Sequence, residues 1–258
     1  MAYCGVVTIR WLTGFIDRPA TSFDSAVRFW SAVTGSSLSP TRGDSAEFAT
    51  LIPPDGDAYL RVQRVGDGPG GSHLDLHVGD VEGFARQAVA AGADEHHRYD
   101  DVVVLRSPAG LPCCVVGHHG EAVRPAPRAV EDTGRFHLVD QLCVDIPAAR
   151  FDEECAFWSG VTGWGQRQSS LRPEFRYLVR PDGCPLRLLL QRCDGDGPAR
   201  AHLDVASDDV DGVVAHHVRL GGAVAAVFEH WTVMADPSGL PYCVTGRDPG
   251  TGLIAVPD

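Results

Sequence analysis

The first half of the chain alternates between two kinds of hydrophobic pattern. Segments that are rich in β-branched residues or strictly alternating, which is typical of strands, occupy residues 6–16, 47–52, 59–65, 73–78, 101–106 and 112–116. Two other segments carry apolar residues at helical spacing: Phe23, Val27, Trp30 and Val33 in one, and Val81, Phe84, Ala88 and Ala91 in the other. Thr21 or Ser22 can cap the first helix and Asp80 the second, while Gly35 and Gly92 can end them. The order strand, helix, strands is therefore expected twice.

Polar side chains gather on one face of two of the predicted strands. At residues 73–78, His73, Asp75 and His77 share a face, and apolar residues share the other. In the N-terminal strand, Trp11 and Thr13 share a face in the same way. These two faces hold the first candidates for a binding site.

The second half of the chain repeats the first. Residues 107–117 and 236–246 agree at seven of eleven positions, residues 23–35 and 151–163 at eight of thirteen, and residues 73–83 and 202–212 at six of eleven. The short block Gly-Asp-Gly-Pro also occurs in both halves. Four matched blocks in the same order indicate an internal duplication. We expect a domain at 1–118, a polar, proline-rich linker at 119–136 and a second domain at 137–258.

Composition and charge narrow the class of protein. The chain has 258 residues, of which 44% are hydrophobic and 22% charged, as in an ordinary globular protein. It has no apolar run of the roughly 20 residues that span a bilayer, and no secretory signal, so a cytoplasmic location is expected by default. A net charge of -12 without a basic cluster argues against nucleic acid and anionic membranes as partners. A monomer or homodimer is expected.

The order of the blocks resembles a known family. A helix ending in Phe-Trp-x-x-Val-Thr-Gly, a His-Leu-Asp strand and a Pro-x-Gly-Leu-Pro-x-Cys strand, each present twice, are similar to the glyoxalase-like domain. That domain belongs to the vicinal oxygen chelate superfamily, with bleomycin-resistance proteins and extradiol dioxygenases. The resemblance implies an α+β fold of four βαβββ modules, forming two cup-shaped half-barrel domains in tandem. Modules would pair either within each half, or first with fourth and second with third.

The resemblance also implies where a metal would bind. Metal-using members take ligands from the first, fourth, fifth and eighth strands of a cup. The fifth-strand histidine is present as His73 and His202. The first-strand position falls on Gln141 in the second half and on Thr13, a poor ligand, in the first. The fourth-strand segments 59–64 and 186–192 contain no carboxylate.

The eighth-strand position carries a thiol in both halves. Cys114 and Cys243 stand where the metal-using members have glutamate. The second cup is therefore the better candidate for a metal, which could be zinc, iron or manganese; zinc could also draw on Asp204. The candidate ligands are His202, Gln141 and Cys243.

Two interpretations remain open for each of these polar residues. His73 with Asp75, and His202 with Asp204, can form dyads for proton transfer or plain structural hydrogen bonds. Both thiols can be buried small hydrophobes rather than reactive groups. A third set of side chains can either contact a flat ligand or simply pack in the core: Trp11, Thr13, Cys114 and Trp231.

Three functions follow from these alternatives. The first, which the loss of both carboxylate ligands favours, is a protein that binds a small organic molecule in a cup without the family's full metal site. The second is a metal-dependent lyase, isomerase or dioxygenase acting in the second cup. The third is a metal-free enzyme that uses an Asp-His dyad.

Overall fold

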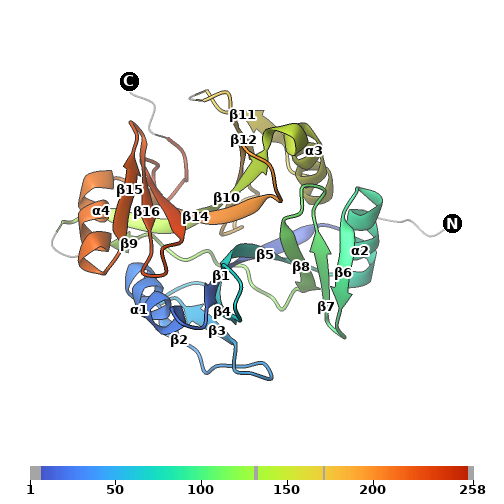
Figure 1. The fold of residues 1–258 in the computed structure, drawn as a ribbon, viewed down its shortest axis with the longest axis horizontal. Coiled ribbons are helices and arrows are strands. Elements are labelled where there is room, and N and C mark those ends of the chain that lie inside the picture. Colours follow the sequence, from blue (N-terminus) through green and yellow to red (C-terminus); the bar gives the residue numbers. More distant parts are fainter. Residues whose placement is uncertain (1–6, 131–132, 171, 255–258) are drawn as a thin grey trace.

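The computed structural model describes residues 7–130, 133–170 and 172–254. Within these residues, each half of the chain forms its own β-sheet, and four α-helices pack around the two sheets (Figure 1). The first residue of the predicted N-terminal strand, Val6, lies outside the described residues.

The first sheet is built around two central strands. β1 (Ile9–Pro19) pairs in parallel with β4 (Leu60–Val65) and antiparallel with β5 (Gly71–Val78). β3 (Phe48–Ile52) and β2 (Ser37–Leu38) extend one side, and the other side continues through β8 (Pro112–Gly117), β7 (Val102–Arg106) and β6 (Asp94–Arg98). The helices are α1 (Phe23–Thr34), which follows β1, and α2 (Val81–Ala90), which follows β5. The first half thus contains two βαβββ modules.

The second sheet repeats this plan. β10 (Phe136–Pro147) pairs in parallel with β13 (Arg187–Cys193) and antiparallel with β14 (Arg200–Ser207). β12 (Phe175–Leu178) and β11 (Gln166–Gln168) lie beyond β13, and β17 (Pro241–Thr245), β16 (Trp231–Ala235) and β15 (Ala223–Val227) lie beyond β14. The helices are the 3₁₀ turn η1 (Ala148–Arg150), α3 (Phe151–Thr162) and α4 (Val210–Arg219). A short strand, β9 (Arg128–Ala129), also pairs with β10.

The sheets show which modules pair. Because β1 pairs with β5 and β10 with β14, the modules join within each half. The helices instead pack across the halves: α1 contacts α4, and α3 contacts the turn that precedes β8 (Figure 1). The Phe29 ring of α1 contacts the His217 ring of α4 edge to face, at 6.0 Å between centroids.

Both contacts between the halves contain a buried carboxylate that accepts from a tryptophan. Trp30 Nε1 donates to Asp236 Oδ2 across the halves at 3.0 Å. Trp158 Nε1 donates to Glu154 Oε1 in its own helix at 2.7 Å, and the second oxygen of Glu154 accepts from the Ala109 amide across the halves. These bonds satisfy the indole N–H groups of two fully buried tryptophans.

The two sheets approach each other closely at Gly14 in β1. A Cβ atom at this position would lie 3.2 Å from a methyl carbon of Leu186 and 3.3 Å from one of Leu203, both in the other half. Glycine is therefore the residue that lets the two sheets pack at this distance.

The sequence pattern misses strands that are exposed or short. The edge strand β6 has five exposed residues, Asp94–Arg98, so it carries no hydrophobic alternation that could reveal it. β10 begins at Phe136, the last residue of the predicted linker. In the predicted linker, β9 reads as irregular because it contributes only two residues to the ladder.

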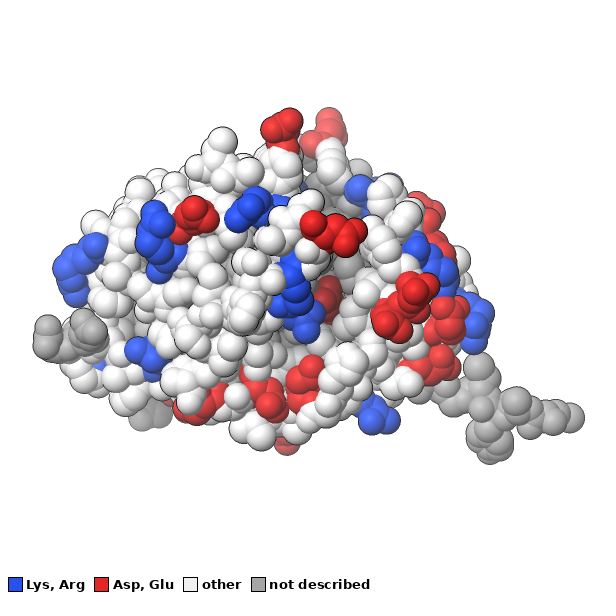
Figure 2. Space-filling model, turned by 90° about the horizontal axis from the view of Figure 1, so that it is seen from below, with Lys and Arg blue, Asp and Glu red and all other residues white. Residues whose placement is uncertain are grey.

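Charged groups are dispersed over the surface. Figure 2 shows basic and acidic side chains interspersed on one face, without a single basic patch. No helix in the described part of the chain has the length and apolar character needed to cross a membrane.

A pair of buried histidines at the contact between α1 and α4 makes stability depend on pH. His217 Nε2 lies 3.4 Å from His137 Nδ1, and His217 Nδ1 lies 3.1 Å from the Tyr242 hydroxyl. Burial, with smaller contributions from His216 and Arg128, lowers the pKa of His137 to about 4. Burial and the neighbouring histidines lower the pKa of His217 well below its usual range.

We expect these histidines to destabilise the fold under mild acid. The unfolded chain binds protons at their usual pKa of 6.5, whereas the folded chain does not until near pH 4, so stability present above pH 6.5 is lost as the pH falls through this window. For His137 the loss is on the order of 3 kcal/mol, since one pKa unit corresponds to about 1.4 kcal/mol. Urea unfolding between pH 7 and pH 4 should show a shallower decline for His137→Gln than for the unmodified chain; equal slopes would contradict this origin.

Candidate functional site

A histidine held between two carboxylates forms the centre of the second cup. His202, on β14, has Nδ1 3.0 Å from Asp145 Oδ2 and Nε2 3.4 Å from Asp204 Oδ1. Strand alternation explains this placement, because Asp204 follows His202 by two residues and Asp145 lies on the adjacent strand β10. Such flanking carboxylates orient the imidazole and favour its protonated form.

Two further side chains complete this cluster. Gln141 Nε2 donates to Asp204 Oδ2 at 2.5 Å, and Cys243 Sγ, on β17, lies 3.5 Å from His202 Nε2. Asp204 Oδ1 is buried and has no hydrogen-bond partner. An unpaired buried carboxylate oxygen next to an imidazole nitrogen and a thiol is a position where a proton, a polar ligand atom or a metal ion would be stabilised.

The cluster opens into a cavity with two chambers. The first, here called the Gln141 chamber, has a volume of about 680 Å³, and the second, the Asp145 chamber, about 630 Å³. The two share five lining residues, which are Phe175, Gln191, His202, Trp231 and Cys243. The rings of Phe175 and Trp231 meet edge to face at 5.8 Å between centroids, while Trp231 also stacks on Phe228 at 4.7 Å. Each chamber is large enough for a small organic molecule with an aromatic wall beside it.

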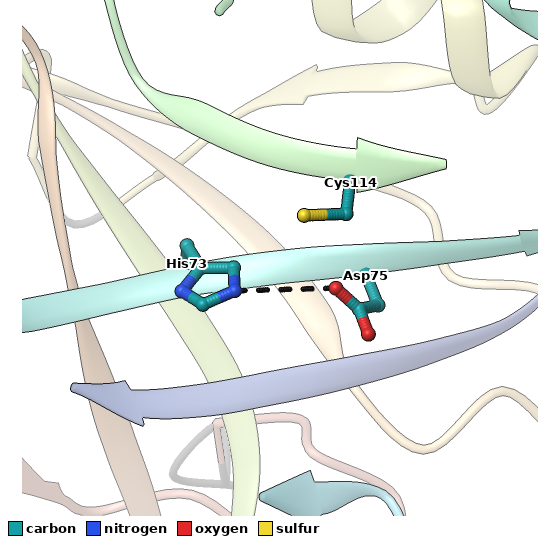
Figure 3. A group of neighbouring side chains, drawn as sticks. All are labelled: His73, Asp75 and Cys114. Carbon is teal, nitrogen blue, oxygen red and sulfur yellow. Dashed lines mark ion pairs between the residues drawn. The ribbon is translucent and has the colours of Figure 1, made fainter. Parts of the chain in front are cut away.

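The first cup has an equivalent His-Asp pair, but different side chains pack against it. Figure 3 shows His73 and Asp75 on β5 beside Cys114 on β8. His73 Nδ1 lies 2.6 Å from Asp17 Oδ2, as His202 does with Asp145. The Phe15 ring stacks on the His73 ring at 4.3 Å between centroids.

An arginine also enters the first cup. Arg61 Nη1 donates to Asp75 Oδ2 at 3.1 Å, and its guanidinium carbon lies 5.8 Å from the centre of the Phe15 ring. Cys143 pairs with His202 as Phe15 pairs with His73, so a smaller side chain lies beside the histidine of the second cup. The second cup is therefore the one that offers both the cluster and open volume.

Burial and the neighbouring charged groups shift the pKa values of the histidines in both cups and of Asp75 in the first. Burial alone would lower the pKa of His202, but Cys143 and the carboxylates of Asp145 and Asp204 raise it well above its usual range. The pKa of His73 is raised in the same manner, because Asp17 more than offsets the effect of burial. Burial raises the pKa of Asp75.

The thiols in the cups are protonated at neutral pH. Burial and Asp204 raise the pKa of Cys243, and burial and Asp145 raise that of Cys193 to about 11. Cys114 is shifted upward by burial and by Asp75. Because the thiolate is the nucleophilic form, these cysteines are poor nucleophiles in this state.

Among the described residues, three groups have donor atoms close enough together to hold a metal ion: His73, Asp75 and Cys114; Cys143, Asp145 and His202; and His202, Asp204 and Cys243. The third group includes the unpaired Asp204 oxygen, and a thiol with an imidazole and a carboxylate suits zinc better than a hard cation. The cup-facing residues of β13 are Arg187, Leu189 and Gln191, so the fourth-strand carboxylate of the family's metal site is missing. A metal held here would bind through a different donor set.

The other residues predicted to contact a ligand differ in whether they line the cavity. Trp231 lines both chambers. Trp11 is fully buried, and its Nε1 donates to the Ala58 carbonyl at 3.2 Å, so it belongs to the core rather than to an open wall. Thr13 Oγ1 lies 2.9 Å from His77 Nε2.

Two aspartates beside the cup histidines are not predicted from the sequence. Asp17 and Asp145 each contact a cup histidine through Nδ1. The signal is present in the sequence, because each stands two residues before the proline that ends its strand, on the same face as Thr13 or Gln141. Continuing the alternation to the end of the strand would identify both.

Two cups, each made of two βαβββ modules and lined by an Asp-His pair, define an α+β protein of the half-barrel class. The chain matches the glyoxalase-like domain family over residues 15–116 and 141–245. It therefore belongs to that family, as a tandem member of the vicinal oxygen chelate superfamily. No curated protein sequence matches the chain significantly.

Solved structures show the same fold at low sequence identity. A Mn(II)-bound glyoxalase from Novosphingobium aromaticivorans superposes with a TM-score of 0.62 at 16% identity, over 93% of this chain and 82% of its own. The 2,2',3-trihydroxybiphenyl 1,2-dioxygenase from Sphingomonas wittichii strain RW1 gives 0.61 at 15% identity, over 94% and 91%. A xylose isomerase-like TIM barrel/4-hydroxyphenylpyruvate dioxygenase fusion protein gives 0.59 at 13% identity; this chain spans 49% of its length. At these identities the similarity shows the fold alone.

Proposed function

We propose that this protein binds a small organic molecule in the second cup, without the full metal site of its metal-using relatives. The observation that carries the proposal is the cavity around His202, whose walls are aromatic and whose polar groups converge from β10, β14 and β17. Concave sites that combine aromatic walls with convergent polar groups are typical of small-molecule sites. In the first cup, Phe15 and Arg61 pack against the equivalent His73–Asp75 pair.

Binding should be detectable through stability and through Trp231. A ligand at about a hundred times its dissociation constant adds about 2.7 kcal/mol of stability, which should raise the Tm by several degrees for a chain of this length. We expect a screen of flat aromatic compounds to yield Tm increases in the unmodified chain that shrink in Trp231→Ala. Tyr99→Ala removes an exposed aromatic side chain elsewhere and serves as the control. A screen in which no compound shifts the Tm would count against the proposal.

A second candidate function, metal-dependent chemistry in the same cup, is favoured by the unpaired Asp204 oxygen. His202, Asp204 and Cys243 would hold the ion, which would act as a Lewis acid toward a ligand oxygen. Protein purified without chelators or affinity histidines should then contain stoichiometric zinc, which is lost in His202→Ala and retained in His73→Ala. Elemental analysis that finds no metal in the unmodified chain would eliminate this candidate.

A further inference from the structure

The two chambers of the second cup differ in charge. The Gln141 chamber is lined by three arginines, Arg167, Arg187 and Arg247, and by a single carboxylate, Asp204. The Asp145 chamber has the opposite balance, with two arginines against four carboxylates: Asp145, Glu174, Asp194 and Asp196. A basic chamber is unexpected in a chain whose net charge is -12.

Arg187 is a partly buried arginine of this chamber that has no carboxylate partner in the described part of the chain. It projects from β13 opposite Gln141, and its guanidinium carbon lies 5.3 Å from the centre of the Tyr177 ring. Its Nη1 donates to the carbonyl of Gly252. No ion pair joins it to a carboxylate within the described residues. In the first cup, by contrast, Arg61 is neutralised by Asp75.

The carboxylate that acts on Arg187 already has another arginine as its partner. Asp140 is bound by Arg247 through both oxygens, each at 2.7 Å. Two more arginines reach this region, Arg180 and Arg124, and both donate to backbone carbonyls. Of these four guanidinium groups, only Arg247 forms an ion pair with a carboxylate among the described residues, and Arg124 lies near Asp248.

The excess of cations has an electrostatic effect on Arg187. Burial and the neighbouring Arg247 lower its pKa to about 10, although it stays charged at neutral pH. Burying a cation without a counter-ion is unfavourable, so an anion that enters the chamber is stabilised. A guanidinium also presents paired N–H donors that match a carboxylate or another oxyanion.

We propose that the second cup recognises a flat, unsaturated organic anion, whose carboxylate or similar oxyanion binds Arg187. This inference rests on the proposed function and adds the chemical class of the ligand. The planar body would lie against Tyr177, Phe175 and Trp231, and the opposite end would reach His202, which lines the same chamber. Gln141 stands between the two ends and can donate to the ligand in place of Asp204.

Two fluorescent probes with the same aromatic skeleton test this assignment. 1-Anilinonaphthalene-8-sulfonate is an anion, and N-phenyl-1-naphthylamine is neutral. We expect Arg187→Met to weaken binding of the sulfonate probe about tenfold or more, because a charged hydrogen bond is lost. Binding of the neutral probe should change by less than about twofold. Arg187→Lys keeps the charge but not the paired N–H donors, so its affinity for the sulfonate probe should lie between that of the unmodified chain and that of Arg187→Met. Arg86→Met removes an exposed cation from α2, outside both chambers, and should leave binding of both probes unchanged.

The outcomes separate this inference from the proposed function. If the neutral probe binds but Arg187→Met weakens both probes equally, or neither, the cup binds small molecules and the role of Arg187 is wrong. If neither probe binds the unmodified chain at the cup, both proposals fail. Circular dichroism of each variant verifies that the fold is retained, and Arg187→Lys provides the test if Arg187→Met does not fold.

Discussion

Replacing Asp236 with alanine is expected to cost about 3–5 kcal/mol of folding free energy, a large share of the stability of a typical domain. Asp236 is fully buried between the halves and accepts from Arg18 Nε at 2.7 Å and from Trp30 Nε1 at 3.0 Å. Its second oxygen accepts from the backbone amides of Ser238 and Leu240. Alanine would leave Arg18 as a buried cation without its partner and remove the contact that joins α1 to the β16–β17 turn.

Urea unfolding of matched variants measures this effect. Asp236→Asn keeps the shape and an acceptor but not the charge, so its loss should be smaller than that of Asp236→Ala. Glu82→Ala removes an exposed partner of Arg98 and should change stability by no more than about 1 kcal/mol. An Asp236→Ala variant as stable as Glu82→Ala would show that this pair does not hold the halves together.

The repeat predicts the fold of each half but not the contacts between the halves. Helix spacing identifies α1 and α2 because each helix buries one face. Asp80 caps α2 as predicted by accepting from the Gly83 amide, whereas Ser22 makes no capping hydrogen bond at the start of α1. The Arg18–Asp236 pair joins residues 218 positions apart, and no local pattern carries such information. The repeat itself obscures it: Asp236 aligns with Ser107, and on that side the buried carboxylate comes from Glu154 on α3 instead.

The candidate site was partly predictable for a similar reason. His202 and Asp204 follow from strand alternation, and Gln141 and Cys243 from the resemblance, and the structure brings all four together. Alternation indicates which residues share a face but not how the cup is filled. The stacking of Phe15 on His73, and the free charge of Arg187, depend on side chains from separate strands, so only the structure distinguishes an open cup from a filled one.

Removing Arg247 is expected to be nearly as damaging as removing Asp236, and to alter the site as well. Arg247 holds Asp140, which is fully buried, through two parallel hydrogen bonds. Arg247→Met removes both bonds from this buried carboxylate, and attraction to Arg187 replaces only part of them, so the variant should cost about 3–5 kcal/mol. Part of this loss should return in the double variant Arg247→Met/Asp140→Leu, since no unpaired charge then remains.

The same pair of variants tests whether Arg247, by binding Asp140, leaves the Arg187 charge free for an anionic ligand. In Arg247→Met, the freed Asp140 attracts Arg187, and anionic probe binding should weaken although Arg187 is present. In the double variant Asp140 is gone, so Arg187 regains its free charge and binding should recover. Urea unfolding and titration with 1-anilinonaphthalene-8-sulfonate measure the two effects on the same samples. If probe binding is unchanged in the single variant, or stability does not recover in the double variant, Asp140 is not the group that decides how much of the Arg187 charge a ligand meets.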